Sequence, residues 1–212
     1  MLAPALATML VVITTDAVIS PELAESALRS ATSVSFDRID SDGCMSTNDT
    51  VLLMASGVSG VAPSDDSFVE ALTKVCSSLA LQLIGDAEGA SKDIAIEVVG
   101  AESVSDALLV ARAVARSNLL KCAIHGEDPN WGRVLSAAGT TTAQFEPDRV
   151  DVLMNGVRVC RGGGVGDDRS LVSLAGREVT IRIELNAGSS SATVWTNDLT
   201  ADYVHENSAY ST

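Results

Sequence analysis

Residues 9–34 read MLVVITTDAVISPELAESALRSATSV and set the first step of the fold. The β-branched apolar run from Met9 to Thr14 predicts a buried strand. Ser20 followed by Pro21 is typical of a helix N-cap and first turn. The apolar residues after this cap keep to one helical face, namely Leu23, Ala27, Ala31 and Val34. A strand therefore leads directly into a helix.

The same alternation of strand and helix continues through the middle of the chain. Thr50–Ala55 predicts another buried strand, and a helix follows from the three-and-four spacing of Phe68, Leu72, Val75, Cys76, Leu79 and Leu83. A third strand is indicated around residues 94–98, where isoleucine and valine alternate with polar or small residues. The pair Ser105-Asp106 then predicts the cap of a third helix, which runs to about Leu120.

The pattern changes to hairpins in the last third of the chain. Val150–Leu153 and Val157–Cys160 flank Asn155-Gly156, a pair that readily adopts positive φ and favours a type I′ turn. Residues 181–185 alternate again, and residues 193–196 are expected to return as their partner strand. Together these elements predict an α/β (α+β) fold of layered sheets covered by helices. Hydrophobic pattern alone does not fix the strand order.

Composition narrows the class of protein. A chain of 212 residues with 46% hydrophobic content can bury a real core. A formal net charge of -14 repels phosphate backbones and anionic lipid, which argues against nucleic-acid and membrane partners. The apolar opening from Met1 to Ile13 is too short to span a bilayer and lacks a preceding Lys or Arg. We therefore expect a soluble, cytoplasmic metabolic enzyme.

Neither the cysteines nor the glycine-rich stretch indicates a metal or a cofactor. The four cysteines are far apart, with no Cys-x-x-Cys pair, so all are expected to be small buried hydrophobes: Cys44, Cys76, Cys122 and Cys160. The run Arg161–Gly166 (RGGGVG) follows a hairpin and precedes no helical pattern. It therefore lacks the context of a dinucleotide-binding loop and is expected to be a flexible surface loop.

Thr8 is the candidate nucleophile. It lies between small residues and the first predicted strand, in the sequence Pro4-Ala5-Leu6-Ala7-Thr8-Met9. A threonine hydroxyl needs a base, and a free α-amine on the same residue can serve as one. Cleavage before Thr8 would create that amine. From the residues alone, a structural threonine at the edge of a strand, explained by its β propensity, is the favoured interpretation.

A series of motifs across the chain resembles the ornithine acetyltransferase family, also described as bifunctional glutamate N-acetyltransferases of the ArgJ type. Pro4 with Ala7-Thr8-Met9-Leu10 is similar to the family's self-processing signature. Further segments look like family motifs in the expected order: Thr14–Asp16, Ser46–Thr50, Ala87–Lys92, Asp128–Arg133, Asp198–Thr200, Tyr203-Val204 and Glu206–Thr212. So many matches in order are far more specific than any one motif.

The resemblance implies a DmpA/ArgJ-like sandwich of the N-terminal-nucleophile type, of which this chain is the C-terminal half. Residues 1–7 would be the remnant of an upstream α chain, and residues 8–212 the β chain, with a smaller hairpin-rich lobe from about residue 140 left open. Self-cleavage between Ala7 and Thr8 would precede a ping-pong reaction. In it, Thr8 takes acetyl from N-acetylornithine and passes it to glutamate.

The resemblance also implies the binding residues and the partners. Thr8, Glu88, Asn207 and Thr212 match substrate-binding positions, and a carboxylate such as Glu88 suits the ammonium of either substrate. The Thr-Gly oxyanion donors and a substrate-binding lysine would lie in the upstream α chain, so this chain alone is expected to be inactive. Two α and two β chains would form a heterotetramer. No cofactor is implied, and whether acetyl-CoA also donates is left open.

The sequence leaves a contact and two alternative functions open. Asn48 and Asp49 are turn residues before a strand, and whether they also touch substrate is undecided. An N-terminal-nucleophile amidase or aminopeptidase of related fold would share the same nucleophile, with water in place of glutamate. An inactive orphan fragment would share the sequence and carry out neither reaction.

Overall fold

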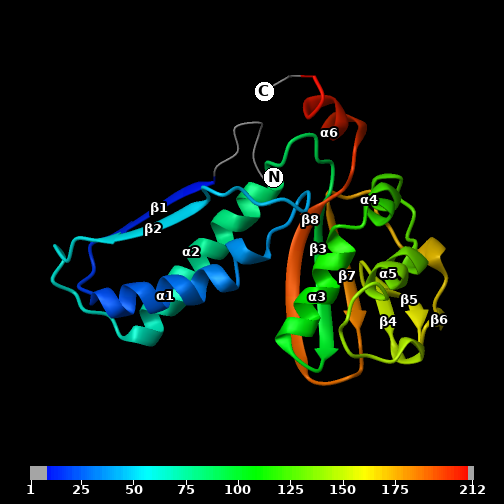
Figure 1. Ribbon diagram of the computed structural model, residues 1–212, viewed down its shortest axis with the longest axis horizontal. Coiled ribbons are helices and arrows are strands. Elements are labelled where there is room, and N and C mark those ends of the chain that lie inside the picture. The colour runs from blue at the N-terminus through cyan, green and yellow to red at the C-terminus, as the bar shows by residue number, and fades with distance from the viewer. Residues whose placement is uncertain (1–8, 210–212) are drawn as a thin grey trace.

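The computed structural model describes residues 9–209 and divides them into two lobes that lie side by side (Figure 1). The first lobe holds a two-stranded sheet and two helices, and the second holds a six-stranded sheet with three helices on one face. A short sixth helix follows the last strand at the end of the molecule where β1 begins (Figure 1). This is the expected α/β architecture of layered sheets covered by helices.

The first lobe is built on a parallel strand pair. β1 (Leu10–Thr15) pairs with β2 (Thr50–Ala55), with Leu10 opposite Thr50. One face packs on α1 (Pro21–Ser33), on the 3-10 helix η1 (Phe36–Arg38) and on α2 (Asp65–Gly85), around a core of Ala27, Ala31, Phe36, Phe68, Leu72, Cys76 and Ala80. By length and hydropathy alone, α2 could cross a membrane. Its buried residues, however, pack inside the protein: four belong to this core, and Ile84 is buried near the C-terminal end of the helix.

The other face of the β1–β2 sheet is apolar and open. Its side chains keep about half or more of their surface accessible: Leu10 72%, Val12 58%, Leu52 49% and Met54 51%. The alternation of exposed and half-buried residues along β1 shows that only one face has a partner. Two strands alone rarely form a stable sheet, so the exposed face is an unusual feature of this lobe.

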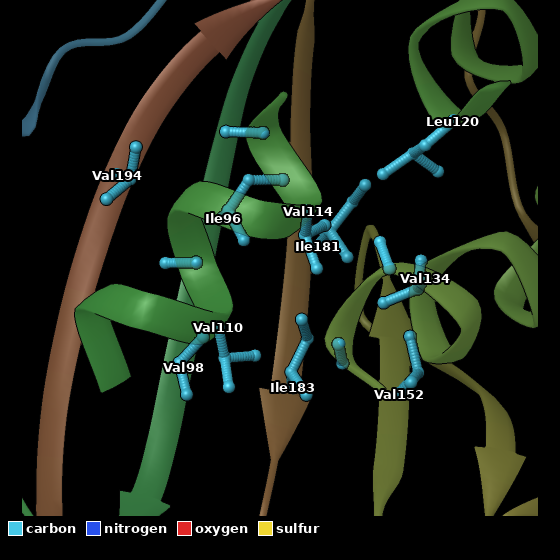
Figure 2. Close-up of a cluster of buried hydrophobic side chains, with 14 of the residues drawn as sticks. Ile96, Val98, Val110, Val114, Leu120, Val134, Val152, Ile181, Ile183 and Val194 are labelled. Carbon is cyan, nitrogen blue, oxygen red and sulfur yellow. The ribbon is translucent and has the colours of Figure 1, made fainter. Parts of the chain in front are cut away.

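The second lobe contains a mixed sheet in the order β6-β5-β4-β7-β3-β8. Its strands are β3 (Asp93–Ala101), β4 (Asp151–Met154), β5 (Val157–Arg161), β6 (Gly164–Val165), β7 (Glu178–Glu184) and β8 (Ser190–Asn197). The covering helices are α3 (Val104–Ala115), α4 (Asn118–His125) and α5 (Trp131–Ala138), and short 3-10 turns occupy Pro147–Arg149 and Arg169–Leu171. Figure 2 shows the core between sheet and helices, where Ile96, Ile181 and Ile183 meet Val110, Val114 and Val134.

Polar contacts join the two lobes. Ile39, after η1, forms an isolated parallel bridge with Trp195 of β8, and the Asp40 N–H donates to the Trp195 carbonyl at 2.8 Å. Arg116 at the end of α3 pairs with Asp40 at 2.6 Å. The Lys121 ammonium of α4 donates to the Ser41 carbonyl. The segment after α1 is therefore fixed to the open edge strand of the larger sheet.

The structure corrects the third predicted helix. Its N-cap is Ser103, whose hydroxyl accepts from the Asp106 N–H, so the cap lies two residues before the predicted Ser105 and the helix begins at Val104. The helix also ends at Ala115, and Ser117 caps the separate helix α4. Each serine hydroxyl accepts a hydrogen bond from an N–H group in the first turn of the helix that follows it. Each serine therefore marks the start of a new helix. The apolar periodicity continued across the break and concealed it.

The prediction for the last two long strands was wrong in its pairing. Both β7 and β8 exist, but they do not pair with each other, since β3 lies between them. β3 is parallel to β7 and antiparallel to β8. The hairpin β4–β5 is confirmed, with Asn155 at φ 44° and Gly156 at φ 85° as a type I′ turn requires. The strands that follow residue 140 share one sheet with β3.

Two smaller expectations also change. The run Arg161–Gly166 is a tight turn into β6, which pairs with β5, and it is not an irregular loop. Cys76 and Cys160 are buried as predicted, and burial raises the pKa of both thiols, but Cys44 and Cys122 are exposed. The loop around Cys44 and the outer side of α4 face solvent, which residue type alone does not reveal.

Candidate functional site

The residues expected to form the site divide into two groups. Ala7, Thr8 and Thr212 lie outside the described residues 9–209. Glu88 and Asn207 lie within them, on two segments that pack together at the end of the molecule where β1 begins (Figure 1). The described segments that carry the candidate site are therefore the start of β1, the loop of residues 86–92 and the last helix.

The main chain of Met9 is held at both its polar atoms. Its N–H donates to Asp49 Oδ1 at 2.8 Å, and its carbonyl accepts from the Thr50 N–H at 2.8 Å. Asp49 precedes β2 directly, and the parallel pairing of β1 and β2 brings it beside the start of β1. The position that follows Thr8 in the sequence is thus fixed by the Ser46–Thr50 motif. Within the described residues, Asp49 has a clear structural partner.

A cavity of about 600 Å³ lies beside Met9, between η1, α1 and the loop that precedes β2. Its lining includes three arginines, each with a partner among the described residues. Arg29 pairs with Glu25 at 2.9 Å, and Arg116 pairs with Asp40 at 2.6 Å. Arg112 donates to the Asp37 carbonyl at 2.8 Å. The cavity is therefore lined by apolar as well as charged side chains, and its three arginines are all paired within the described residues.

Glu88 lies in the loop of residues 86–92, which connects α2 to β3. Its side chain is half-buried, and within residues 9–209 its carboxylate makes no hydrogen bond or ion pair. The next residue, Gly89, has φ +64°, and a Cβ there would overlap the main-chain nitrogen of Tyr203. This close approach places Glu88 next to the last helix and leaves its carboxylate available to a ligand.

Asn207 ends the last helix, α6 (Ala201–Glu206). It is exposed, and its side-chain amide donates to the Tyr203 carbonyl at 2.9 Å. At the other end of α6, the Thr200 hydroxyl accepts from the Tyr203 N–H at 2.9 Å and donates to the Gly89 carbonyl at 2.6 Å. Glu88 and Asn207 are thus carried by two segments in direct contact. No described contact joins either of them to Met9 or Asp49.

A buried carboxylate next to this site was not expected from the sequence. The side chain of Asp198 is fully buried and contacts Ser91 and His125. Its Oδ1 accepts the main-chain N–H groups of Ser91 and Lys92, both at 2.9 Å. Burial opposes the charged form, but these hydrogen bonds outweigh it and hold the pKa of Asp198 below its ordinary value. Asp198 and Ser91 both lie in quoted motifs, and only their 107-residue separation hid the contact.

The Ser91, His125 and Asp198 side chains do not form a nucleophile triad. In such a triad the histidine contacts the acid with one ring nitrogen and the serine with the other. Here Asp198 Oδ2 accepts directly from Ser91 Oγ at 2.5 Å, and the same His125 Nδ1 faces both partners, at 2.9 Å and 3.4 Å. The serine proton is therefore committed to Asp198. The group holds segments together and does not activate a hydroxyl.

Lys121 is a second buried charge that the sequence did not reveal. It is 5% exposed, and its ammonium donates to the Ser41 carbonyl and contacts Thr196 Oγ1 at 3.3 Å. Burial lowers the pKa of Lys121 to about 8, and the nearby negative charges of Asp40 and Asp198 limit the decrease. Its contacts bridge the two lobes.

Within the described residues, no group of His, Cys, Asp or Glu side chains is arranged to hold a metal ion.

Comparisons with known proteins agree over the full chain. A family model described as "ArgJ family" matches residues 1–212. The chain is 66% identical over 212 residues to "Arginine biosynthesis bifunctional protein ArgJ" of Thermobifida fusca and 68% identical over 211 residues to the protein of the same description from Streptomyces coelicolor. Each match covers 100% of this chain and 55% of the relative. The chain thus spans about half the length of these relatives.

A solved structure shows the same fold. The crystal structure of "Arginine biosynthesis bifunctional protein argJ" from Bacillus halodurans matches with a TM-score of 0.91 at 35% sequence identity. The match covers 96% of this chain and 100% of that one. The predicted fold class, with layered sheets covered by helices, is therefore confirmed.

Proposed function

This chain belongs to the ArgJ family, and from that membership we propose that it is the nucleophile-bearing part of an acetyltransferase of arginine biosynthesis. The reaction moves acetyl from N2-acetyl-L-ornithine to L-glutamate. The observation that carries this proposal is the match of the whole chain, at 66% and 68% identity, to relatives described as arginine biosynthesis bifunctional proteins. The fold that this chain shares with the Bacillus halodurans structure supports the proposal.

The proposed chemistry begins with self-cleavage between Ala7 and Thr8. The freed α-amine of Thr8 then takes the proton of its own hydroxyl as the oxygen attacks the acetyl carbonyl. The C–N bond of N-acetylornithine breaks, the proton passes to the leaving amine, and acetyl-Thr8 remains. In the second half-reaction the amine of glutamate attacks acetyl-Thr8 and releases N-acetylglutamate. Each half-reaction forms an oxyanion, whose donors would come from the upstream α chain.

The main-chain contacts of Met9 support a positioned nucleophile. Acyl transfer is fast only when the reacting atoms are held in place before the reaction. Asp49 and Thr50 hold Met9, the residue next to Thr8, at its N–H and its carbonyl. Asp49 therefore shapes the site through the main chain.

Glu88, Asn207 and Thr212 complete the proposed substrate site on this chain. Glu88 suits an ammonium group because the residue is half-buried and its carboxylate forms no ion pair within residues 9–209. An ion pair there would orient the substrate as well as hold it. Asn207 offers an exposed amide at the end of α6, the helix that packs against the Glu88 loop. Substrate would then bind beside the contact between the loop of residues 86–92 and α6.

The proposed partner is the upstream α chain of the same precursor, within a heterotetramer of two α and two β chains. The relatives extend well beyond the matched region, since the match covers 55% of their length. The exposed apolar face of the β1–β2 sheet, formed by Leu10, Val12, Leu52 and Met54, is a surface that such a segment would bury. We expect the chain to transfer acetyl only when this segment is present.

We also propose that the enzyme is cytoplasmic and uses no cofactor. The net charge of -14 suits a cytoplasmic enzyme acting on small molecules, without nucleic-acid or membrane partners. The reaction as written needs no cofactor, because the acetyl group passes from one amine to another through Thr8. Acetyl-CoA is considered only as an alternative acetyl donor. An acetyl-transfer assay with acetyl-CoA in place of N-acetylornithine shows whether the enzyme accepts it.

The test is an acetyl-transfer assay on the chain co-expressed with the upstream part of its precursor. N-acetylornithine and glutamate should yield ornithine and N-acetylglutamate in equal amounts, and Thr8→Ala should yield neither. Thr142→Ala, at an exposed threonine remote from β1, serves as the matched control and should behave as the unmodified enzyme. Release of free acetate without N-acetylglutamate would replace the transferase by an amidase.

A further inference from the structure

Asp198 is a fully buried carboxylate that the proposed chemistry does not use. Four donors converge on it: the Ser91 N–H and Lys92 N–H at 2.9 Å each, the Ser91 hydroxyl at 2.5 Å and His125 Nδ1 at 2.9 Å. Two of these donors are main-chain groups of the loop of residues 86–92. A buried charge with this many partners fixes the position of each of them.

The same loop is also held by the start of α6. The Thr200 hydroxyl donates to the Gly89 carbonyl at 2.6 Å, and Gly89 leaves no room for a side chain against Tyr203. Asp198 precedes Thr200 by two residues, so one short segment binds the loop at its middle, through Gly89, and at its end, through Ser91 and Lys92. Asn197, directly before Asp198, adds side-chain bonds to the Ile84 and Lys92 carbonyls at 3.0 and 3.2 Å.

These contacts hold the loop of residues 86–92, here called the Glu88 loop, and α6 together as a single rigid unit. Glu88 lies between the end of α2, held through the Ile84 carbonyl, and Ser91, held by Asp198. Asn207 lies at the far end of α6, whose first turn is fixed through Thr200. The relative position of these two proposed substrate ligands therefore depends on the contacts of Asp198.

We propose that Asp198 is a positioning residue for acetyl transfer, which acts by holding the Glu88 loop against α6. The inference rests on the proposed function, because Glu88 and Asn207 are substrate ligands only within it. Asp198 itself touches neither substrate nor the reacting atoms. Its loss should loosen substrate binding through Glu88 and leave the self-cleavage before Thr8 intact, since Met9 and Asp49 share no contact with it.

The kinetic test compares Asp198→Asn, Glu88→Gln and the double variant in the co-expressed enzyme. Asp198→Asn keeps the shape but removes the charge, and we expect kcat/KM for both substrates to fall about tenfold. If Asp198 acts through Glu88, the double variant should be no worse than Glu88→Gln alone. Full additivity of the two losses, or unchanged constants in a folded Asp198→Asn enzyme, would overturn the role.

A matched control separates positioning from general stability. Asp151 is partly buried and, like Asp198, its carboxylate accepts a main-chain N–H, here from Gly162; it also pairs with an arginine, but it lies on the β4–β5 hairpin. Asp151→Asn should lower the melting temperature without changing kcat/KM. If Asp198→Asn does not fold, Ser91→Ala removes one of the same bonds from an exposed partner and should give a smaller loss in the same direction.

Hydrogen exchange tests the contact even without activity. In Asp198→Asn, amides of residues 86–92 and 201–206 should exchange faster together, while those of the β4–β5 hairpin keep their rates. Faster exchange in only one of the two segments would contradict the single rigid unit. An unmodified enzyme that transfers no acetyl group would reject the proposed function alone, because the exchange result stands independently of it.

Discussion

The Asp49 carboxylate accepts a hydrogen bond from the Met9 N–H, with 2.8 Å between Oδ1 and nitrogen. This nitrogen joins Met9 to Thr8, so a residue 40 positions downstream holds the main chain next to the proposed nucleophile. The bond links the Ser46–Thr50 motif to the start of β1. It gives the motif before β2 a structural role at the start of β1.

Asp49→Ala should slow both self-cleavage and acetyl transfer. Removal of the acceptor frees the Met9 N–H, and small displacements of a reacting group cost about 10- to 100-fold in rate. Asp49→Asn retains an acceptor oxygen and should recover most of the activity. Intact mass over time and kcat measure the two reactions. Asp66→Ala, at an exposed carboxylate in the first turn of α2, is the control, and equal rates in Asp49→Ala would refute this role.

Glu88→Gln should weaken productive substrate binding and leave self-cleavage unchanged. The amide keeps the shape of the side chain but loses the charge that would pair with an ammonium, so kcat/KM should fall about 10- to 100-fold. Steady-state kinetics with varied N-acetylornithine and varied glutamate measure the effect. Glu146→Gln, at an exposed glutamate before the 3-10 turn Pro147–Arg149, should have no effect. Kinetic constants of Glu88→Gln equal to those of the control would remove Glu88 from the site.

Gly89→Ala and Gly60→Ala form a matched pair. The two glycines have nearly the same positive φ, +64° and +69°, but only Gly89 faces the Tyr203 main chain, whereas Gly60 faces open space. Gly60→Ala should cost about 1 kcal/mol for the strained backbone. Gly89→Ala adds the overlap and should cost about 3 kcal/mol or more. Denaturant unfolding measures both, and equal losses would show that the loop does not press on α6.

The buried Lys121 predicts a dependence of stability on alkaline pH. Its pKa of about 8 in the folded protein lies below the ordinary value of 10.5, so between these values the unfolded chain binds more protons. Stability should therefore rise with pH from about 8 to 10.5, by at most about 1.4 kcal/mol per pH unit from this group. Below pH 8 the cost of burying the charge is fully present. Lys121→Met should flatten this rise, and Lys74→Met, at an exposed lysine, should retain it.

Local sequence signals predicted the elements that local chemistry determines. The Ser20-Pro21 cap opens α1, Thr50–Ala55 forms β2, and Asn155-Gly156 makes the turn between β4 and β5. Each depends on a few adjacent residues. The failures come from longer range. The Ser117 cap that divides α3 from α4 lies inside an unbroken apolar pattern, and the insertion of β3 between β7 and β8 depends on the packing of the whole sheet.

The candidate site shows the same contrast between what local sequence motifs indicate and what depends on contacts between distant residues. Glu88 and Asn207 were predicted from motifs, and the structure brings their segments together. Asp198 also lies in a predicted motif, but its role depends on contacts with Ser91 and His125, which are distant in the chain. Lys121 gave no signal because a lysine within an amphipathic helix usually faces solvent. Only the fold shows which polar residues become buried.

The most direct test of the central claim is mass spectrometry of the co-expressed enzyme incubated with N-acetylornithine alone. We predict that Met1–Ala7 are lost and that one acetyl group appears on the hydroxyl of Thr8, in a peptide that begins with this residue. Addition of glutamate should remove that acetyl group and produce N-acetylglutamate. An intact Ala7–Thr8 bond, or an acetyl group that forms on another residue and leaves with glutamate, would contradict the assignment of Thr8 as the nucleophile.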